Sequence, residues 1–106
     1  MTPETFTQVL DSRINKIMDV LDAKAKEYAP GTDRLHNFKR AAAINSSTPI
    51  NQAWNFATKH LVSILDMKED PTKYSLAQWD EKMGDMINYL ILMEACVHEA
   101  HAAKKP

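Results

Sequence analysis

Three scarcities narrow what this chain of 106 residues can be. It has one cysteine, Cys96, which excludes an internal disulfide and is typical of a buried, inert thiol in a reducing cytoplasm. It has only two glycines, and neither belongs to a Gly-rich loop of the kind that cradles phosphates. The net charge of −1 argues against general nucleic-acid binding, which needs a broad basic surface. We therefore expect no nucleic-acid partner.

Long apolar runs are also lacking. No stretch approaches the roughly 18 apolar residues of a membrane span, so we expect no membrane partner. The first residues lack the basic and apolar regions of a secretory signal, and we expect a cytoplasmic location. With 44% apolar and 25% charged residues, the composition is that of an ordinary globular protein. The length predicts one domain, residues 1–106.

Capping patterns divide the chain into helices. Thr2-Pro3-Glu4 places a capping hydroxyl, a proline and an acid at a helix start, and this helix should run to about Tyr28. Pro30-Gly31 should end it. Thr48-Pro49 repeats the start signal for a helix that ends before Lys68.

Two further helices complete the prediction. Thr32 or Asp33 is expected to cap a short helix containing Leu35, Phe38, Ala42 and Ile44. Ser75 and Gln78 form a capping box for a last helix that fades near Ala103. No alternating strand pattern appears, so the predicted fold is an all-α bundle of three long helices and one short helix. The predicted core side of the helix after Thr48 consists of Ile50, Trp54, Ala57, Leu61 and Ile64.

The last helix organises the molecule because it is apolar on almost every side. One seam repeats at three- and four-residue steps, and Glu81, Asp85 and Asn88 lie opposite it, within about 60° of one another. A helix that is apolar all round is normally buried all round. We therefore expect Asp85 and Asn88 where water is scarce, and we expect a homo-oligomer that covers the rest. The seam residues are Leu76, Trp79, Met83, Met86, Leu90, Met93 and Val97.

The polar stripe of this helix has a functional and a structural interpretation. Glu81 and Asp85, one turn apart, project into the same space and could hold a divalent cation such as Mg²⁺ through oxygen ligands. Structural ion pairs or a solvated helix face would produce the same pattern.

A second polar group lies on the helix after Thr48. Lys59, Ser63 and Asp66 share a face, with His60 beside Ser63. This face is opposite the predicted core side, so it meets either solvent or a partner subunit. The composition alone does not make a hydrolytic triad, which is recognised by geometry.

A third group is the basic stretch from Lys24 to Arg40, which carries five Lys or Arg against two acids. It includes a helix start, where free N–H groups favour anions. Phosphate binding and a solvated basic patch are the two interpretations, and an aromatic side chain there could stack on a base. Its candidate ligand-binding residues are Tyr28, Arg34, His36, Asn37, Lys39 and Arg40.

A fourth group, Glu94, His98 and His101, shares a face near the end of the last helix. Imidazoles and a carboxylate can bind zinc. The spacing is too short for the zinc-protease helix motif, and helix ends fray. We therefore expect a solvated helix end.

The segment Glu81-Lys82-Met83-Gly84-Asp85 and the order of helices resemble the MazG-like all-α nucleotide pyrophosphohydrolases. The chain is most similar to small phage-encoded relatives of the nucleotide-modification-associated type. Three further segments carry that resemblance: Glu27-Tyr28-Ala29, the stretch 33–39, and the stretch from Lys59-His60 to Asp66-Met67. A phage origin would place the protein in the cytoplasm of the host cell.

The resemblance implies magnesium held by two acids on one helix and by a Glu-Glu-x-Gly-Asp segment on the next. Here Glu81, Gly84 and Asp85 match that segment, but Lys82 replaces its second acid. His60 and Ser63 stand near the positions where the paired acids of the other helix would fall. A lysine in this place repels magnesium and attracts phosphate. The resemblance therefore implies a nucleotide-sized, phosphate-bearing ligand more strongly than hydrolysis.

Three hypotheses follow for function. The first is a phage-type protein that binds a phosphorylated nucleotide, or a nucleotide-derived signal of host defence, without turnover and without a required cofactor. The second is a Mg-dependent nucleotide pyrophosphohydrolase with Glu81 and Asp85 as metal ligands. The third is a structural or protein-interaction bundle. In the first, phosphates would meet Arg34, His36, Lys39, Lys59 and His60, and the base or ribose would meet Asp85 and Asn88.

Overall fold

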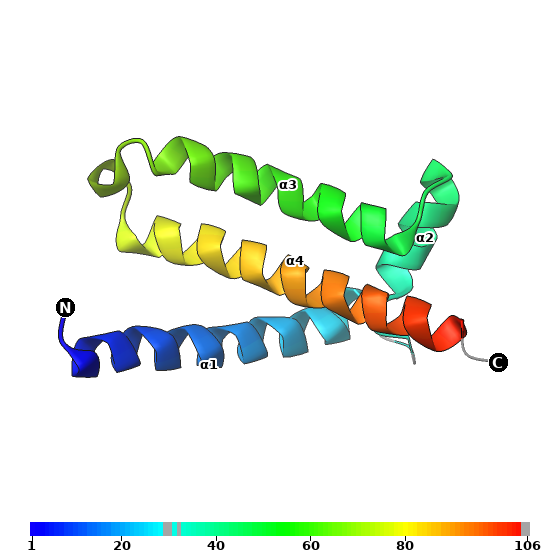
Figure 1. Ribbon diagram of the computed structural model, residues 1–106, viewed down its shortest axis with the longest axis horizontal. Coiled ribbons are helices and arrows are strands. Elements are labelled where there is room, and N and C mark those ends of the chain that lie inside the picture. The colour runs from blue at the N-terminus through cyan, green and yellow to red at the C-terminus, as the bar shows by residue number, and fades with distance from the viewer. Residues whose placement is uncertain (29–30, 32, 105–106) are drawn as a thin grey trace.

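A computed structural model of the chain describes residues 1–28, 31 and 33–104. These residues form only helices and connections, which confirms the predicted all-α bundle of three long helices and one short helix (Figure 1). None of the helices in these ranges combines the length and the hydrophobicity that a membrane span requires. The elements are α1 (Pro3–Tyr28), α2 (His36–Asn45), α3 (Pro49–Met67), the 3₁₀ turn η1 (Pro71–Lys73) and α4 (Leu76–Ala103).

Three helices begin with the predicted side-chain caps. The hydroxyls of Thr2 and Thr48 each accept a hydrogen bond from the backbone N–H three residues later, at 3.1 and 3.2 Å. Ser75 and Gln78 form the reciprocal capping box, with bonds of 3.1 and 2.8 Å. Each cap satisfies backbone donors that a helix start leaves without a partner. The predicted starts of α1, α3 and α4 are therefore confirmed.

The start of α2 differs from the prediction. Leu35 is its N-cap residue and has no side-chain cap. Asp33 lies two residues earlier, and its carboxylate accepts a 2.9 Å hydrogen bond from the Leu35 N–H, which forms a turn before the helix. Thr32, the other predicted cap, and Pro30, the predicted helix breaker, lie outside the described residues. At the other end, Ser46 adopts the left-handed conformation with φ 51° and turns the chain toward α3.

The helices form an elongated bundle with extents of 50 × 27 × 27 Å. α3 and α4 lie side by side and antiparallel, joined by the turn that contains η1 (Figure 1). α2 packs at the end of this pair where α3 begins. α1 lies on the other side of α4, near its first half, and runs in the same direction (Figure 1). α4 is therefore the central helix, as its apolar composition predicts.

The core lies where α2, α3 and α4 meet. Ala53 and Ala57 are fully or almost fully buried, and such small side chains allow α3 to approach α4 closely. The predicted core side of α3 is partly wrong, because the Trp54 side chain is 42% exposed. Apolar residues occur on several sides of α3, so periodicity alone did not identify the buried side. The buried core cluster consists of Leu35, Phe38, Ala53 and Cys96.

α4 does not follow the pattern of a simple amphipathic helix, because its polar stripe and its apolar seam each contain both exposed and covered residues. Within the polar stripe, Asn88 is only 5% exposed, which confirms the expected burial of that residue, whereas Asp85 is partly buried and Glu81 is exposed. The apolar seam is open along much of its length, with Leu76 88% exposed and Met83, Leu90 and Val97 also exposed. The expected homo-oligomer, which would cover this open part of α4, stays a prediction.

Candidate functional site

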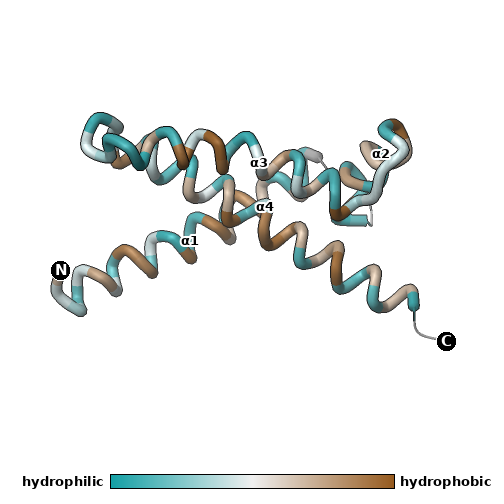
Figure 2. Tube along the Cα trace, turned by 45° about the horizontal axis from the view of Figure 1, so that its top comes forward, coloured by the Kyte–Doolittle hydropathy of each residue, from teal (hydrophilic) through white to brown (hydrophobic). Residues whose placement is uncertain are grey.

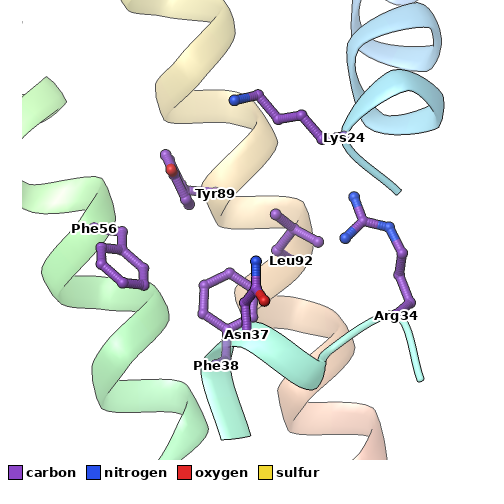
Figure 3. Close-up of a pocket in the computed structure, with 7 residues that line it drawn as sticks. All are labelled: Lys24, Arg34, Asn37, Phe38, Phe56, Tyr89 and Leu92. Atoms are coloured by element: carbon purple, nitrogen blue, oxygen red, sulfur yellow. The ribbon is translucent and has the colours of Figure 1, made fainter. Parts of the chain in front are cut away.

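A pocket of about 320 Å³ opens where all four helices approach one another (Figure 3). Four secondary-structure elements contribute to it, because α2 crosses the α3–α4 pair beside the C-terminal end of α1. We call it the aromatic pocket. Its lining residues are Lys24, Arg34, Asn37, Phe38, Phe56, Tyr89 and Leu92.

A row of three aromatic rings forms one wall of the aromatic pocket. Phe38, Phe56 and Tyr89 come from α2, α3 and α4 respectively. The ring centroids of Phe38 and Phe56 are 5.8 Å apart, and those of Phe56 and Tyr89 are 6.1 Å apart, both in tilted arrangements. Such spacings are typical of favourable aromatic contacts. The wall therefore offers fixed, flat apolar surfaces to a planar ligand.

Polar side chains border the pocket on the side away from Phe56 (Figure 3). Lys24 comes from α1, and Arg34 comes from the segment before α2. The Arg34 guanidinium donates a 3.2 Å hydrogen bond to the Leu21 carbonyl, which connects this segment to α1. Asn37 adds an amide, which can both donate and accept hydrogen bonds. One wall is thus aromatic and the opposite border is cationic.

The buried His60 lies directly behind the aromatic wall. Its ring stacks on Tyr89, with centroids 5.4 Å apart and planes 18° apart, and the residue is 8% exposed. Its Nδ1 is 3.6 Å from an oxygen of Asp85, which is too long for a hydrogen bond, and Nδ1 has no other partner among the described residues. Burial lowers the pKa of His60, and the Asp85 carboxylate opposes this effect in part. His60 is therefore favoured as a neutral ring.

The polar stripe of α4 borders a second hollow, of about 280 Å³, between α1 and α4. Glu81, Asp85 and Asn88 all line it, and in the part of the chain that the structure describes the buried side-chain oxygen of Asn88 has no hydrogen-bond partner. Arg13 and Lys16 border the same hollow, but both pair with Asp80. Asp85 of the predicted stripe thus lies close to His60 where α3 and α4 are in contact. The sequence alone did not show whether these two groups would meet.

The candidate metal ligands Glu81 and Asp85 lie on neighbouring turns of α4 and both line this hollow. Within residues 1–28, 31 and 33–104, no three His, Cys, Asp or Glu side chains gather closely enough to hold one ion. Asp66 borders a different hollow together with Glu81 and Lys82. The nearest ionisable partner of Asp85 is His60.

The predicted ligand-binding residues divide between these places. Arg34 and Asn37 line the aromatic pocket, and Asp85 and Asn88 line the hollow beside α1. Lys39 instead bridges two acids, Asp33 at 2.7 Å and Glu99 on α4, and the hydrogen bond that it donates to Asp33 is the main cause of its raised pKa. The side chain of Tyr28 lies outside the described part of the structure. The exposed residues His36, Arg40 and Lys59 line neither cavity.

The group near the end of α4 stays in solvent. His98 and Glu94 are 3.9 Å apart, with side chains 80% and 74% exposed. An exposed pair at this distance contributes little energy. The expected solvated helix end is confirmed.

Five lining residues of the aromatic pocket were absent from the predicted site, and one of them, Phe38, was expected in the core. Lys24 stood at the edge of the predicted basic stretch, and Phe56, Tyr89 and Leu92 lay within apolar patterns that indicate packing. A sequence signal existed in two places. Phe56 is one turn before His60, and Tyr89 directly follows Asn88, so each aromatic ring accompanies a polar candidate.

The chain was compared with known proteins at three levels. It matches no protein family model, no curated protein and no solved structure. The resemblance to MazG-like proteins therefore rests on the quoted residues alone and stays a prediction.

Proposed function

We propose that this chain binds a phosphorylated nucleotide in the aromatic pocket and holds it without turnover. The observation that supports the proposal is the row of Phe38, Phe56 and Tyr89 opposite Lys24 and Arg34 in one pocket. A nucleotide combines a flat, apolar base with an anionic phosphate, and these two walls match its two parts.

The aromatic wall suits the base. Stacking of a base on an aromatic side chain contributes about 1–3 kcal/mol and tolerates different bases. Phe56 is 40% exposed, so part of its ring is open to a ligand. Asn37 has the amide group that hydrogen-bonds base edges, and we assign it the selection among bases.

The cationic border suits the phosphate. Arg34 retains guanidinium N–H groups beyond the one that bonds the Leu21 carbonyl, and arginine binds phosphate in a bidentate manner. The same bond holds the Arg34 side chain in place, which reduces the entropy lost when a ligand binds. The pocket volume of about 320 Å³ lies at the small end of the range for ligand sites, about 300–1,000 Å³, which favours one nucleotide.

A second candidate function is magnesium-dependent pyrophosphohydrolysis at the hollow beside α1. The observation that favours it is the unpartnered oxygen of Asn88 next to Glu81 and Asp85. A cation there could take oxygen ligands from Asp85 and from either Glu81 or Asn88, each about one turn away on the same helix. The protein-interaction hypothesis requires neither cavity to bind a small ligand.

The test is a binding panel with matched variants. Purified protein is incubated with nucleoside mono-, di- and triphosphates and with cyclic nucleotides, with and without Mg²⁺. Free ligand is then separated, the protein is denatured, and the free and released compounds are chromatographed. We expect intact nucleotide without Mg²⁺. Phe56→Ala should weaken binding about 10- to 100-fold, the equivalent of one stacked base. Trp54→Ala is the control, since Trp54 has nearly the same exposure on the same helix, 42%, but does not line the pocket.

Two results would contradict sequestration. Monophosphate and pyrophosphate that appear only with Mg²⁺, and disappear in Asp85→Asn, would establish the hydrolase. A panel in which nothing binds and nothing is cleaved would support the protein-interaction hypothesis.

A further inference from the structure

α1 carries an apolar stripe that no other part of the described chain covers. Five large apolar residues on this helix are exposed, with exposed fractions from 46% to 62%. Four of them recur at every fourth position and so form one continuous ridge. Figure 2 shows the corresponding hydrophobic segments along α1. The residues are Phe6, Val9, Leu10, Ile14 and Met18.

A groove of about 430 Å³ lies beside this ridge, between α1 and the first half of α4. Among the described residues that line it, the charged ones are Arg13 and Asp80, which form a 2.6 Å ion pair. The groove therefore selects an apolar occupant rather than a charged one. Its apolar lining consists of Phe6, Val9, Leu10, Leu76, Trp79, Met83 and Ile87.

The whole chain exposes more surface than a protein of its size should. Its accessible surface is 7757 Å², whereas a compact monomer of its 12.0 kDa mass exposes about 6,000 Å². Its radius of gyration is 16.1 Å, against about 13 Å for a compact domain. The surplus of about 1,800 Å² exceeds the roughly 800 Å² that each partner buries in a standard interface, and it suits an obligate homodimer.

We infer that a second copy of this chain covers the ridge and the groove. The face offers a convex ridge beside a concave groove, so two copies related by a two-fold axis fill each other's grooves reciprocally. The product is a four-helix core made of α1 and α4 from each copy. The aromatic pocket lies near the other end of α1, at Lys24, and shares no lining residue with the groove.

The test measures mass in solution by sedimentation equilibrium or light scattering, from 1 to 100 µM. We expect twice the chain mass of 12.0 kDa, or a larger closed assembly built on the same face. The double variant Leu10→Glu, Ile14→Glu should weaken association by at least about 100-fold, because it buries charges in an apolar contact. The matched control is Val62→Glu, Leu65→Glu, which has similar exposure on α3, on the far side of α4.

Every result other than these contradicts the inferred dimer. A wild-type monomer at 100 µM contradicts it without any variant, so misfolding of a variant cannot obscure the result. An assembly that survives Leu10→Glu, Ile14→Glu but dissociates in the α3 control would place the interface elsewhere. A monomer that floats with phosphatidylcholine–phosphatidylglycerol vesicles would make the face a lipid-binding surface. A monomer that does not bind vesicles would indicate that a different protein covers this face.

Discussion

The α3–α4 pair and α1 represent two different ways for a helix to be held in this molecule. α3 and α4 lie together along their lengths, with Ala53 and Ala57 buried between them. α1 meets α4 through the ion pairs of Arg13 and Lys16 with Asp80, and its apolar residues Ile17 and Val20 are only partly buried beside them. The first contact is buried and includes the polar His60 among its apolar residues, whereas the ion pairs of the second contact are partly exposed. The difference indicates that α3 and α4 depend on packing within the chain, while α1 has its apolar surface available for another chain.

The largest expected effect comes from placing a charge in each region. Ala57→Asp puts an unpaired carboxylate where the side chain is 1% exposed, and we expect it to lower the free energy of unfolding by at least about 3 kcal/mol. Ala23→Asp is the matched control on an exposed part of α1, and the loss of helix propensity alone predicts about 0.7 kcal/mol. Urea denaturation measures both. Equal losses would contradict the contrast between the two regions.

The second effect is an acid sensitivity of the α3–α4 contact. Because burial lowers the pKa of His60, the unfolded chain binds a proton at a higher pH than the folded one does. The stability is therefore greatest above the ordinary value of 6.5 and decreases as the pH falls below it. We expect a decrease between pH 7.5 and pH 5.5, smaller than that caused by Ala57→Asp. Asp85→Asn should enlarge it, because this carboxylate partly offsets the cost of protonation.

The variant His60→Gln supplies the check on this acid effect. It should remove most of the pH dependence in that range, whereas His98→Gln, at an exposed position, should not. Urea denaturation at a series of pH values gives the comparison. A slope that survives His60→Gln would assign the acid sensitivity to another group.

The smallest effect concerns the attachment of α1. Asp80→Asn weakens the pairs with Arg13 and Lys16, and exposed pairs of this kind contribute about 1 kcal/mol or less. We expect hydrogen exchange of α1 amides to accelerate by up to about fivefold, while α3 and α4 are unchanged. The measurement belongs in the Leu10→Glu, Ile14→Glu background, where a second copy does not protect α1. Equal acceleration in all helices would show that α1 is not a separate unit.

The carboxylate of Asp80 also makes the attachment of α1 to α4 depend on pH. The hydrogen bond from Lys16, followed by the charge of Arg13, lowers the pKa of Asp80 in the folded chain. Its contribution is therefore fully present above the ordinary value of 3.8 and is lost as the pH falls through the lower, folded value. The acid sensitivities of the two regions thus occupy different pH ranges.

Local signals predicted the helices well because helix starts are determined by nearby residues. Thr2, Thr48 and the Ser75–Gln78 box each act within one turn, and all three predictions are confirmed. The orientation of α3 depends on which neighbours it meets. Trp54 belongs to a convincing apolar period, yet Ala53 and His60 face the bundle instead. Burial of small and polar residues is a tertiary property, which periodicity does not contain.

The candidate site was predictable only in part, for the same reason. The basic stretch pointed to Arg34 and Asn37, but the same stretch contains Lys39, whose partner Glu99 lies 60 residues away. Phe56 and Tyr89 became candidates only when α2, α3 and α4 were seen to converge. A cationic side chain that pairs with an acid from another helix is less available to a ligand. Which acids lie close to it depends on how the helices pack, and the sequence alone does not show this.

The elongation of the bundle has a practical consequence for hydrodynamic measurements. With extents of 50 × 27 × 27 Å, one chain is nearly twice as long as it is wide and experiences more friction than a sphere of equal mass. It will elute early from a gel-filtration column, in the direction of an apparent dimer. Sedimentation velocity alone would err in the opposite direction, since extra friction slows the particle. The elongated shape therefore raises the apparent mass in gel filtration and lowers it in sedimentation velocity.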